Sequence, residues 1–321
     1  MVRAVRLTRR RFIALIGAAG AAALASLLVP YILPAGGVKR VRFSTTTSLY
    51  ETGLLDYLAS RYERVRRGVD IEFIPVGTGA ALRIASEGSV EGVFVHAPNL
   101  EAEYLSRGVL THHKILAFNY FCIVGPHEDP ARVRGARDAI DAFRRIWRAG
   151  EDGRAIFVSR GDKSGTNIRE MIIWRLAGLA PDPRRQRWYR VTGEGMAETL
   201  LVAENLGAYT LSDTGTFYKL KREGRLPRLE MLYTGDPILL NIYSAYVVKM
   251  RAETREGREA AMFIDFIAEH PELINEFDGG VGVRLFYAAD REVLPWLRRA
   301  WSIMARGEWG RLYEVVPRGG S

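Results

Sequence analysis

Four turns rich in serine, threonine and glycine each follow an apolar segment and precede a segment with helical periodicity. They span residues 44–48, 77–79, 159–166 and 212–216. The free backbone N–H groups and partial positive charge at a helix N-terminus favour an anion, and hydroxyl groups add neutral donors. Ser, Thr and Asp are also ordinary N-caps, so one such turn alone indicates only a capped helix. Four such turns, one of which contains Arg160, together predict a shared oxyanion site.

These turns do not match common catalytic motifs. The segment Gly161–Gly165 (GDKSG) is not a P-loop, because no glycine directly precedes its lysine, and its serine does not lie midway between two glycines as in a nucleophile elbow. The five histidines, one of which is His96, show no metal-ligand spacing. A single cysteine, Cys122, excludes an internal disulfide framework and a multi-cysteine metal centre. The sequence therefore predicts neither an enzyme nor a bound metal or other cofactor.

The segments that position the turns alternate between strand-like and helical patterns. The predicted strands are 41–44, 69–75, 92–96, 115–118, 121–124, 155–158 and 208–211. The predicted helices are 50–66, 80–87, 138–148, a segment from the 159–166 turn to about 176, 196–206 and a segment after 216. This order predicts an α/β fold with a largely parallel sheet covered by helices. In such a sheet a ligand lies at the carboxyl ends of the strands, where the turns are.

Composition gives little support for a nucleic-acid partner. The chain has 321 residues, 48% of them hydrophobic and 26% charged, as expected for one large or two ordinary globular domains. Its net charge is +9, but residues 1–38 carry five arginines and no acidic residue. The remainder has 41 basic and 37 acidic residues, a surplus of only four. We expect no nucleic acid to bind.

The N-terminus is typical of a targeting segment. Thr8–Ile13 (TRRRFI) is similar to a twin-arginine export signal, and the apolar run Phe12–Leu33 follows. Ala23–Ala25 offers a small-residue cleavage site before Ser26. The 22-residue run is also long enough to span a bilayer uncleaved, with its arginines on the cytoplasmic side. We expect export, with residues 1–38 either a cleaved signal or an N-terminal membrane anchor.

Six segments in the same order resemble the tungstate-binding proteins of Tup-type ABC transporters. They are TTTSLYETGLLDYL (45–58), VGTGAALRIA (76–85), FNYFCIVGP (118–126), FVSRGDKSGTNIRE (157–170), GEGMAETLLVAENLGAYTLSDTGTF (193–217) and GDPILLNIYSAYVV (235–248). The resemblance implies a type II periplasmic-binding fold, in which two α/β lobes flank a cleft and two hinge crossings lie near Asn119 and Tyr243. Residues 39–118 and 243–321 would form lobe one, and residues 119–242 lobe two.

The resemblance also implies a set of ligand donors. It places them at Thr46, Thr47, Ser48, Thr78, Gly79, Arg160, Ser164, Gly165 and Thr166, with a backbone N–H and a packing wall added by Gly195 and Met196. Arg160 would be the one full positive charge and would form charge-assisted hydrogen bonds to a dianion. Lys163, Asn167 and Thr214 depart from the family, which commonly has an acid, a histidine and an arginine at these positions.

The implied function is that of a monomeric extracytoplasmic solute-binding protein, which captures tungstate by closure of its lobes and delivers it to an ABC permease. Phosphate is the strongest alternative ligand, because phosphate-binding proteins of this superfamily share the Arg-x-Asp-x-Ser-Gly-Thr spacing of residues 160–166. Asp162 pointing into the site would accept the proton of hydrogen phosphate, whereas Asp162 turned toward Arg160 or a helix end would favour tungstate. Molybdate and sulfate also stay open, since their shape and charge are similar.

A membrane-anchored sensor or interaction module that binds no anion is an alternative from a different class. Its support is the apolar helical pattern of residues 294–304, with arginines on the opposite face. This pattern fits contact with a membrane or permease, or packing of the helix on lobe one.

Overall fold

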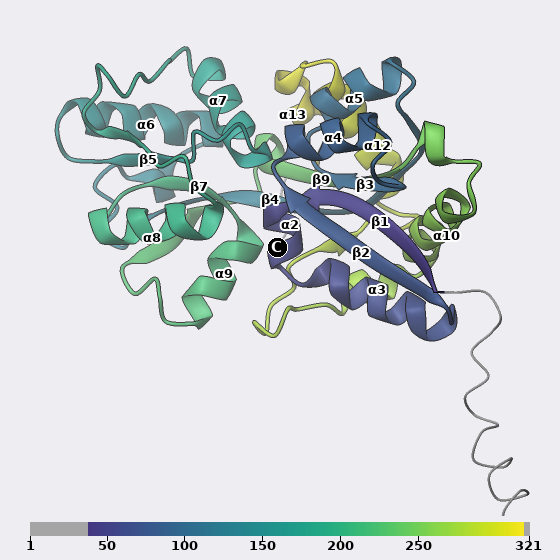
Figure 1. Cartoon of the computed structure of the whole chain (residues 1–321). Coiled ribbons are helices and arrows are strands. Elements are labelled where there is room, and N and C mark those ends of the chain that lie inside the picture. Colours follow the sequence, from purple (N-terminus) through teal and green to yellow (C-terminus); the bar gives the residue numbers. More distant parts are fainter. Residues whose placement is uncertain (1–37, 318–321) are drawn as a thin grey trace, which may run out of the picture. The chain divides into compact units, whose positions relative to one another are not determined.

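A mixed β-sheet organises the protein, as seen in a computed structural model that describes residues 38–317 (Figure 1). Its main strand order is β10 (Tyr287–Ala288), β4 (Leu110–Pro126), β9 (Leu240–Val248), β3 (Gly92–Val95), β1 (Lys39–Thr46) and β2 (Val69–Val76). Two further strands, β7 (Thr210–Asp213) and β8 (Leu229–Tyr233), pair with the C-terminal part of β4, from Phe121 to Pro126. A separate pair is formed by β5 (Phe157–Ser159) and β6 (Tyr189–Val191).

Helices cover both parts of this sheet, so the predicted α/β class is confirmed. They are α2 (Thr47–Glu51), α3 (Leu54–Val65), α4 (Thr78–Ser86), α5 (Pro98–Ser106), α6 (Ala139–Glu151), α7 (Gly165–Leu176), α8 (Met196–Leu206), α9 (Thr214–Arg222), α10 (Arg255–Glu269), α11 (Pro271–Asn275), α12 (Leu294–Ala305) and α13 (Leu312–Val315). The expected caps form where the sequence places them: Asp138 caps α6 by accepting from the Asp141 N–H over 2.7 Å.

The prediction of a largely parallel sheet is wrong for the part of the chain that the structure describes. Parallel pairing joins β1 to β3 and β5 to β6. Antiparallel pairing joins β4 to β7, β8, β9 and β10, and β3 to β9. The cause is β4, which was expected as two strands but continues through Asn119 and Tyr120, where it pairs with Asn241 and Leu240 of β9. Each of these antiparallel pairings involves β4 or β9, the two long strands that run antiparallel to each other.

The predicted helix 50–66 is divided. Gly53 has φ of +81°, a left-handed conformation that glycine adopts without a side-chain clash, and it separates α2 from α3. The Thr52 hydroxyl donates to the Leu49 carbonyl over 2.7 Å and so satisfies an acceptor near the end of α2. The helix α2 therefore has only 5 residues, and the chain turns at Thr52 and Gly53 before α3 begins.

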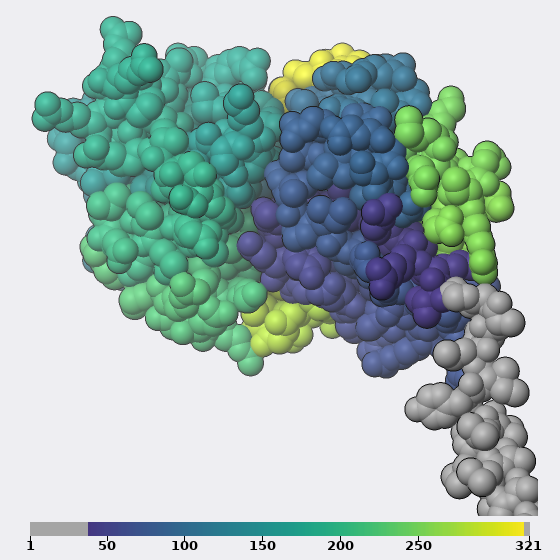
Figure 2. All heavy atoms as spheres, in the orientation of Figure 1, coloured from purple at the N-terminus to yellow at the C-terminus, as the bar shows by residue number. Residues whose placement is uncertain are grey.

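Strand β4 contributes to two hydrophobic cores. Phe121 and Ile123 pack in a cluster with α6 and α7, whereas Leu116 and Ala117 pack in a cluster with α3 and α10. Figure 1 shows α6–α9 and α3–α5 on opposite sides of the region where β4 and β9 run together. In Figure 2 the side chains of these two regions meet along one boundary. The division into lobes 39–118 with 243–321 and 119–242 stays a prediction.

The C-terminal segment packs within the protein. Leu297 and Ala300 of α12 are fully buried, and α12 lies against α5 and β4. The Trp301 indole donates to the buried Glu101 carboxylate over 2.9 Å. Intramolecular packing therefore accounts for the apolar pattern of residues 294–304. The expected signal or anchor lies outside the described residues, and among residues 38–317 no helix is long and apolar enough to cross a bilayer.

Candidate functional site

The first two predicted turns lie side by side at the ends of β1 and β2. Thr46 is the N-cap of α2, and its hydroxyl accepts from the Leu49 N–H over 3.3 Å. Thr78 opens α4 and is buried. Ser44 of β1 donates to the Ala81 carbonyl of α4 over 2.9 Å, which fixes the first turn against the second. Hydroxyl groups from two helix N-termini are thereby brought to one edge of the sheet.

The third turn joins β5 to α7 and carries a buried arginine. Arg160 is 4% exposed, so it is not a surface arginine. Its Nη2 donates to Asp162 Oδ2 over 2.6 Å, and Asp162 Oδ1 accepts from the Ser164 N–H over 3.1 Å. Ser164 is the N-cap of α7 and accepts from the Asn167 N–H over 3.3 Å. Asp162 is therefore engaged by the arginine and by the helix start.

The buried carboxylate of Glu170 holds the residue before this turn, Ser159, against α7. Glu170 of α7 accepts from the Ser159 hydroxyl over 2.6 Å, from Tyr189 over 2.7 Å and from Trp174 over 3.1 Å. Burial raises the pKa of the Glu170 carboxyl, and these hydrogen bonds oppose that rise. The end of β5, directly before Arg160, is thus held against α7 by bonds that do not use the arginine.

Two close approaches bring turns from distant parts of the chain together. The His96 ring, directly after β3, lies against Gly165, where a Cβ would be only 2.7 Å from His96 Cε1. Thr52, after α2, lies against Gly215 of α9, where a Cβ would be 3.2 Å from the threonine methyl. Both contacts depend on a glycine in the first turn of a helix. The turns around residues 46–52 and 96 therefore face the N-termini of α7 and α9.

The charges near these turns act on one another. Burial is the main cause of the raised pKa of the Glu51 carboxyl; Glu198 and Asp213 add to the rise, and Arg160 opposes it. Burial likewise raises the pKa of Asp213, which accepts from the Thr216 N–H over 2.8 Å as the N-cap of α9. The positive charge of Arg160 therefore favours the ionised form of both Glu51, at the end of α2, and Asp213, at the start of α9, by lowering the pKa of each carboxyl.

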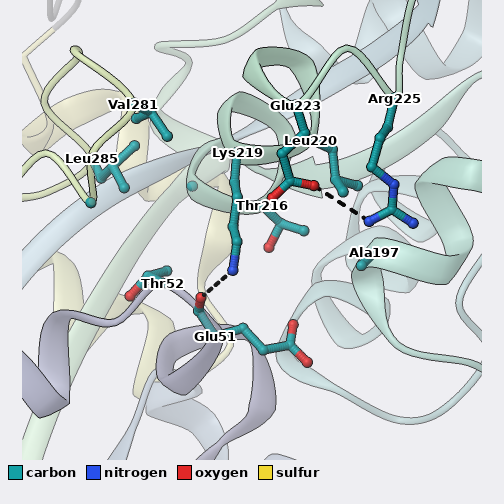
Figure 3. Close-up of a pocket in the computed structure, with 12 residues that line it drawn as sticks. Glu51, Thr52, Ala197, Thr216, Lys219, Leu220, Glu223, Arg225, Val281 and Leu285 are labelled. Carbon is teal, nitrogen blue, oxygen red and sulfur yellow. Dashed lines mark hydrogen bonds and ion pairs between the residues drawn. The ribbon is translucent and has the colours of Figure 1, made fainter.

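A pocket of about 190 Å³ lies beside this cluster (Figure 3). In it, Lys219 of α9 donates to the Glu51 carbonyl over 3.2 Å, and the Glu51 carboxylate projects from the end of α2. The remaining lining includes Leu220, Val281 and Leu285. The pocket borders the turns through Thr52 and Thr216, and its lining contains none of the predicted ligand donors.

Unsatisfied polar atoms are concentrated at the predicted turns. Within residues 38–317, six buried side-chain nitrogen or oxygen atoms have no hydrogen-bond partner. Four of them belong to the predicted turns, namely Thr45 Oγ1, Thr78 Oγ1, Arg160 Nε and Thr166 Oγ1, and a fifth is His96 Nε2, directly after β3. Each buried unsatisfied group costs about 1–3 kcal/mol. Such a concentration is expected where a bound ligand supplies the missing partners.

The predicted donors differ in how deeply they are buried. Thr46, Ser48, Thr78, Arg160, Ser164, Gly165 and Thr166 are buried, whereas Thr47 is half-buried and Gly79 is exposed. Gly195 is the half-buried N-cap of α8, and Met196 packs in the hydrophobic core behind it. No group of three or more His, Cys, Asp or Glu residues suited to a metal ion occurs in the described part of the chain. The predicted donors are hydroxyl groups, backbone N–H groups and one guanidinium, a set that suits an anion.

Sequence reasoning did not single out His96 or Arg169 for the site, and it included Thr45 and Asp213 only as members of predicted turns, not as donors. Arg169 is a second buried guanidinium, which donates to the Leu240 carbonyl over 2.7 Å and lies 4.7 Å from the Trp309 ring. Arg160 is thus accompanied by another buried cation. A signal for His96 was present, because it directly follows an apolar strand, as the predicted turns do.

Comparison with known proteins gives consistent results. A family model described as a PBP superfamily domain matches residues 33–270. A Haloferax volcanii protein named for anion binding in an ABC transporter is 44% identical over 182 residues, which are 57% of this chain and 51% of that protein. The match thus spans about half the length of that relative.

Two further matches extend over more of the relatives. The tungstate-binding protein TupA of Peptoclostridium acidaminophilum is 31% identical over 207 residues, covering 64% of this chain and 68% of that protein. The solved structure of TupA from Desulfovibrio alaskensis aligns with a TM-score of 0.67 and 35% identity, covering 78% of this chain and 98% of that structure. Similarity in sequence and in fold therefore points to the same group of proteins.

Proposed function

Because the chain belongs to the PBP superfamily and, within it, to the family of TupA tungstate-binding proteins, we propose that it captures tungstate and delivers it to an ABC permease. The protein would act outside the cytoplasm, as the expected export signal requires. Its role would be binding, not catalysis, as in the named relatives. We expect a monomer that carries one anion.

The observation that carries this proposal is the set of five buried unsatisfied atoms, four at the predicted turns and one on His96. The hydroxyl groups of Thr78 and Thr166 and the Nε–H of Arg160 are hydrogen-bond donors. A tetrahedral oxyanion presents four oxygens as acceptors, so it satisfies several such donors at once. The N-termini of α4 and α7 add backbone N–H groups and a favourable dipole. We therefore assign the ligand to the turns 44–48, 77–79 and 159–166.

The direction of Asp162 supports tungstate over phosphate. Its carboxylate accepts from Arg160 and from the Ser164 N–H. A phosphate site needs a carboxylate free to accept the proton of hydrogen phosphate, whereas fully deprotonated tungstate offers no proton. An acceptor facing an acceptor in a buried site is costly. Asp162 therefore orients the arginine while Arg160 supplies charge to the anion.

Capture would work by closure about the paired strands. β4 and β9 are neighbours at Asn119 and Asn241, near the expected crossings. Lys219 on α9 and Glu51 on α2 already form a hydrogen bond from one side of these strands to the other. An anion that contacts both sides binds the closed form better and shifts the population toward it. The closed form would then dock on the permease.

Calorimetric titration of the purified protein with tungstate, molybdate, sulfate and phosphate, each in a separate run, tests the proposal. We expect tight binding of tungstate and little response to phosphate. Binding of phosphate alone would keep the site but reassign its ligand. The absence of binding for all four anions would refute the transport role.

A further inference from the structure

A buried chain of amide hydrogen bonds fixes which nitrogen of His96 carries a proton. The Leu285 carbonyl can only accept, so Asn119 donates to it from Nδ2, over 3.3 Å. The oxygen of Asn119 then accepts from Asn241 Nδ2 over 3.0 Å, and the same Nδ2 donates to the Tyr243 hydroxyl over 2.7 Å. Asn241 therefore presents its oxygen to His96 Nδ1, 2.9 Å away. Nδ1 must be the protonated nitrogen.

The other ring nitrogen, Nε2, consequently carries a lone pair when the ring is neutral. Nε2 is buried and has no hydrogen-bond partner among residues 38–317. The ring lies against Gly165, the first residue of α7 and one of the predicted donors. A lone pair at this position repels the oxygen of a fully deprotonated anion. Only protonation of Nε2 turns it into a donor, because Nδ1 is held by Asn241.

The surroundings of His96 keep the ring neutral before an anion binds. Burial is the main cause that lowers its pKa to about 4, and the guanidinium groups of Arg160 and Arg169 lower it further. The Tyr243 ring lies 5.1 Å away on β9, and Asp213 at the end of β7 acts on that tyrosine. A dianion beside Arg160 would add negative charge next to two cations. The electrostatic balance at His96 would then favour the imidazolium form.

On the basis of the proposed function, we infer that His96 takes up one proton when the site binds a fully deprotonated oxyanion such as tungstate. The new N–H at Nε2 becomes a charge-assisted donor in the closed site. Hydrogen phosphate brings its own proton, so its binding should need no such uptake. His96 is therefore a specificity-determining residue whose protonation state follows the ligand.

Proton uptake has a defined effect on affinity. Binding and protonation are linked. If bound tungstate raises the pKa of His96, protonation of His96 must in turn strengthen tungstate binding. Between the free and the bound pKa, tungstate affinity should rise up to tenfold for each unit of pH lowered. Above the bound pKa the affinity should no longer depend on this residue's protonation.

Calorimetry in two buffers of different ionisation enthalpy measures the protons taken up per tungstate. At pH 6 we expect about one for the wild type and close to none for His96→Gln, which should also bind at least tenfold more weakly. His113→Gln is the matched control: His113 is half-buried and its pKa is likewise lowered to about 4, but it packs on Tyr246 and Trp301. This variant should take up protons like the wild type.

Tungstate binding by the wild type without proton uptake would overturn the inference and leave the proposed function intact. Undiminished uptake in His96→Gln would also overturn it. Absence of tungstate binding would refute the proposed function and the inference together. If His96→Gln does not fold, ¹⁵N NMR of the wild-type ring gives the same answer. Nε2 should change from the unprotonated to the protonated shift on addition of tungstate, and an unchanged shift would contradict the inference.

Discussion

Arg160 donates from Nη2 to Asp162 Oδ2 over 2.6 Å, while its Nε lies buried with no partner among the described residues. One nitrogen of the guanidinium is therefore held by the protein, while the Nε–H would remain able to donate to a ligand. This arrangement would let a single arginine be held in place by Asp162 and still contact the proposed ligand. It also explains why its carboxylate partner need not touch the anion.

Replacement of Arg160 by alanine should remove most of the tungstate affinity. The variant leaves a buried dianion without its charge partner, and loss of one partner of a buried ion pair costs about 3–5 kcal/mol. We expect a loss of at least about 100-fold by calorimetry. Arg258→Ala is a suitable control, because Arg258 is an exposed arginine paired with Glu253. Equal affinity in Arg160→Ala and the control would place the site elsewhere.

Replacement of Asp162 by asparagine tests its orienting role. The amide keeps the shape of the side chain but weakens its hold on Arg160, so tungstate affinity should fall by about tenfold, or about 1.4 kcal/mol. Phosphate should remain the weaker ligand in competition titrations. If phosphate binds the wild type strongly and Asp162→Asn abolishes that binding, Asp162 contacts the ligand and the assignment to tungstate is wrong.

Thr78→Val should separate stability from binding. The valine removes a buried hydroxyl that has no partner within residues 38–317, so the melting temperature of the free protein should stay the same or rise. Tungstate affinity should nevertheless fall by about fivefold to thirtyfold, or about 1–2 kcal/mol.

The control for Thr78→Val is Thr254→Val. Thr254 caps α10 by accepting from the Gly257 N–H over 2.9 Å. Its loss should lower stability by about 1 kcal/mol with tungstate affinity unchanged. The opposite pattern, a large loss of stability in Thr78→Val with no loss of binding, would show that its hydroxyl is structural.

Acid should destabilise the free protein through His113, which is half-buried. Burial lowers the pKa of His113 to about 4 from the usual 6.5. Between these values the unfolded chain binds a proton that the folded chain does not, so stability falls as the pH drops from about 6.5 toward 4. The loss from His113 should approach about 3 kcal/mol, since one pKa unit corresponds to about 1.4 kcal/mol.

Thermal unfolding across this pH range checks the prediction. His113→Gln should flatten the decline relative to the wild type. His127→Gln should leave it unchanged, because the His127 side chain is 70% exposed. Identical profiles for all three proteins would rule out a contribution from His113.

Lys219→Met should shift the free protein toward an open form. The variant removes the hydrogen bond from Lys219 to the Glu51 carbonyl, which links α9 to α2. Small-angle X-ray scattering should give a larger radius of gyration without tungstate and the wild-type value with it. Lys221→Met is the control, because Lys221 donates to the carbonyl groups of Leu226 and Leu229 on its own side. A wild-type radius in both free variants would argue against this contact as a closure element.

Local patterns made much of the fold predictable. Helix 196–206 and the Asp138 cap depend on periodicity and capping within a few residues, and both form as expected. Pairing between β4 and β9 joins residues such as Asn119 and Asn241, which are 122 positions apart, and no local pattern encodes it. The mainly antiparallel pairing of the sheet was therefore missed.

The same limit applies to the site. Thr78, Arg160 and Thr166 belong to recognisable turns, so their burial beside helix starts was foreseeable. The role inferred for His96 depends on its hydrogen bond to Asn241, 145 positions away, and on its contact with Gly165. Neither relationship leaves a spacing motif around the histidine.

The position of β9 within the sheet has a consequence for biosynthesis. β9 lies between β4 and β3, yet its residues, 240–248, are translated long after both neighbours. Until they leave the ribosome, β3 and β4 each expose an unpaired edge, and such edges invite aggregation. Pairings of such long sequence separation also slow folding. A nascent chain that stops before residue 240 should therefore need chaperone protection, whereas one that extends past residue 248 can complete the centre of the sheet.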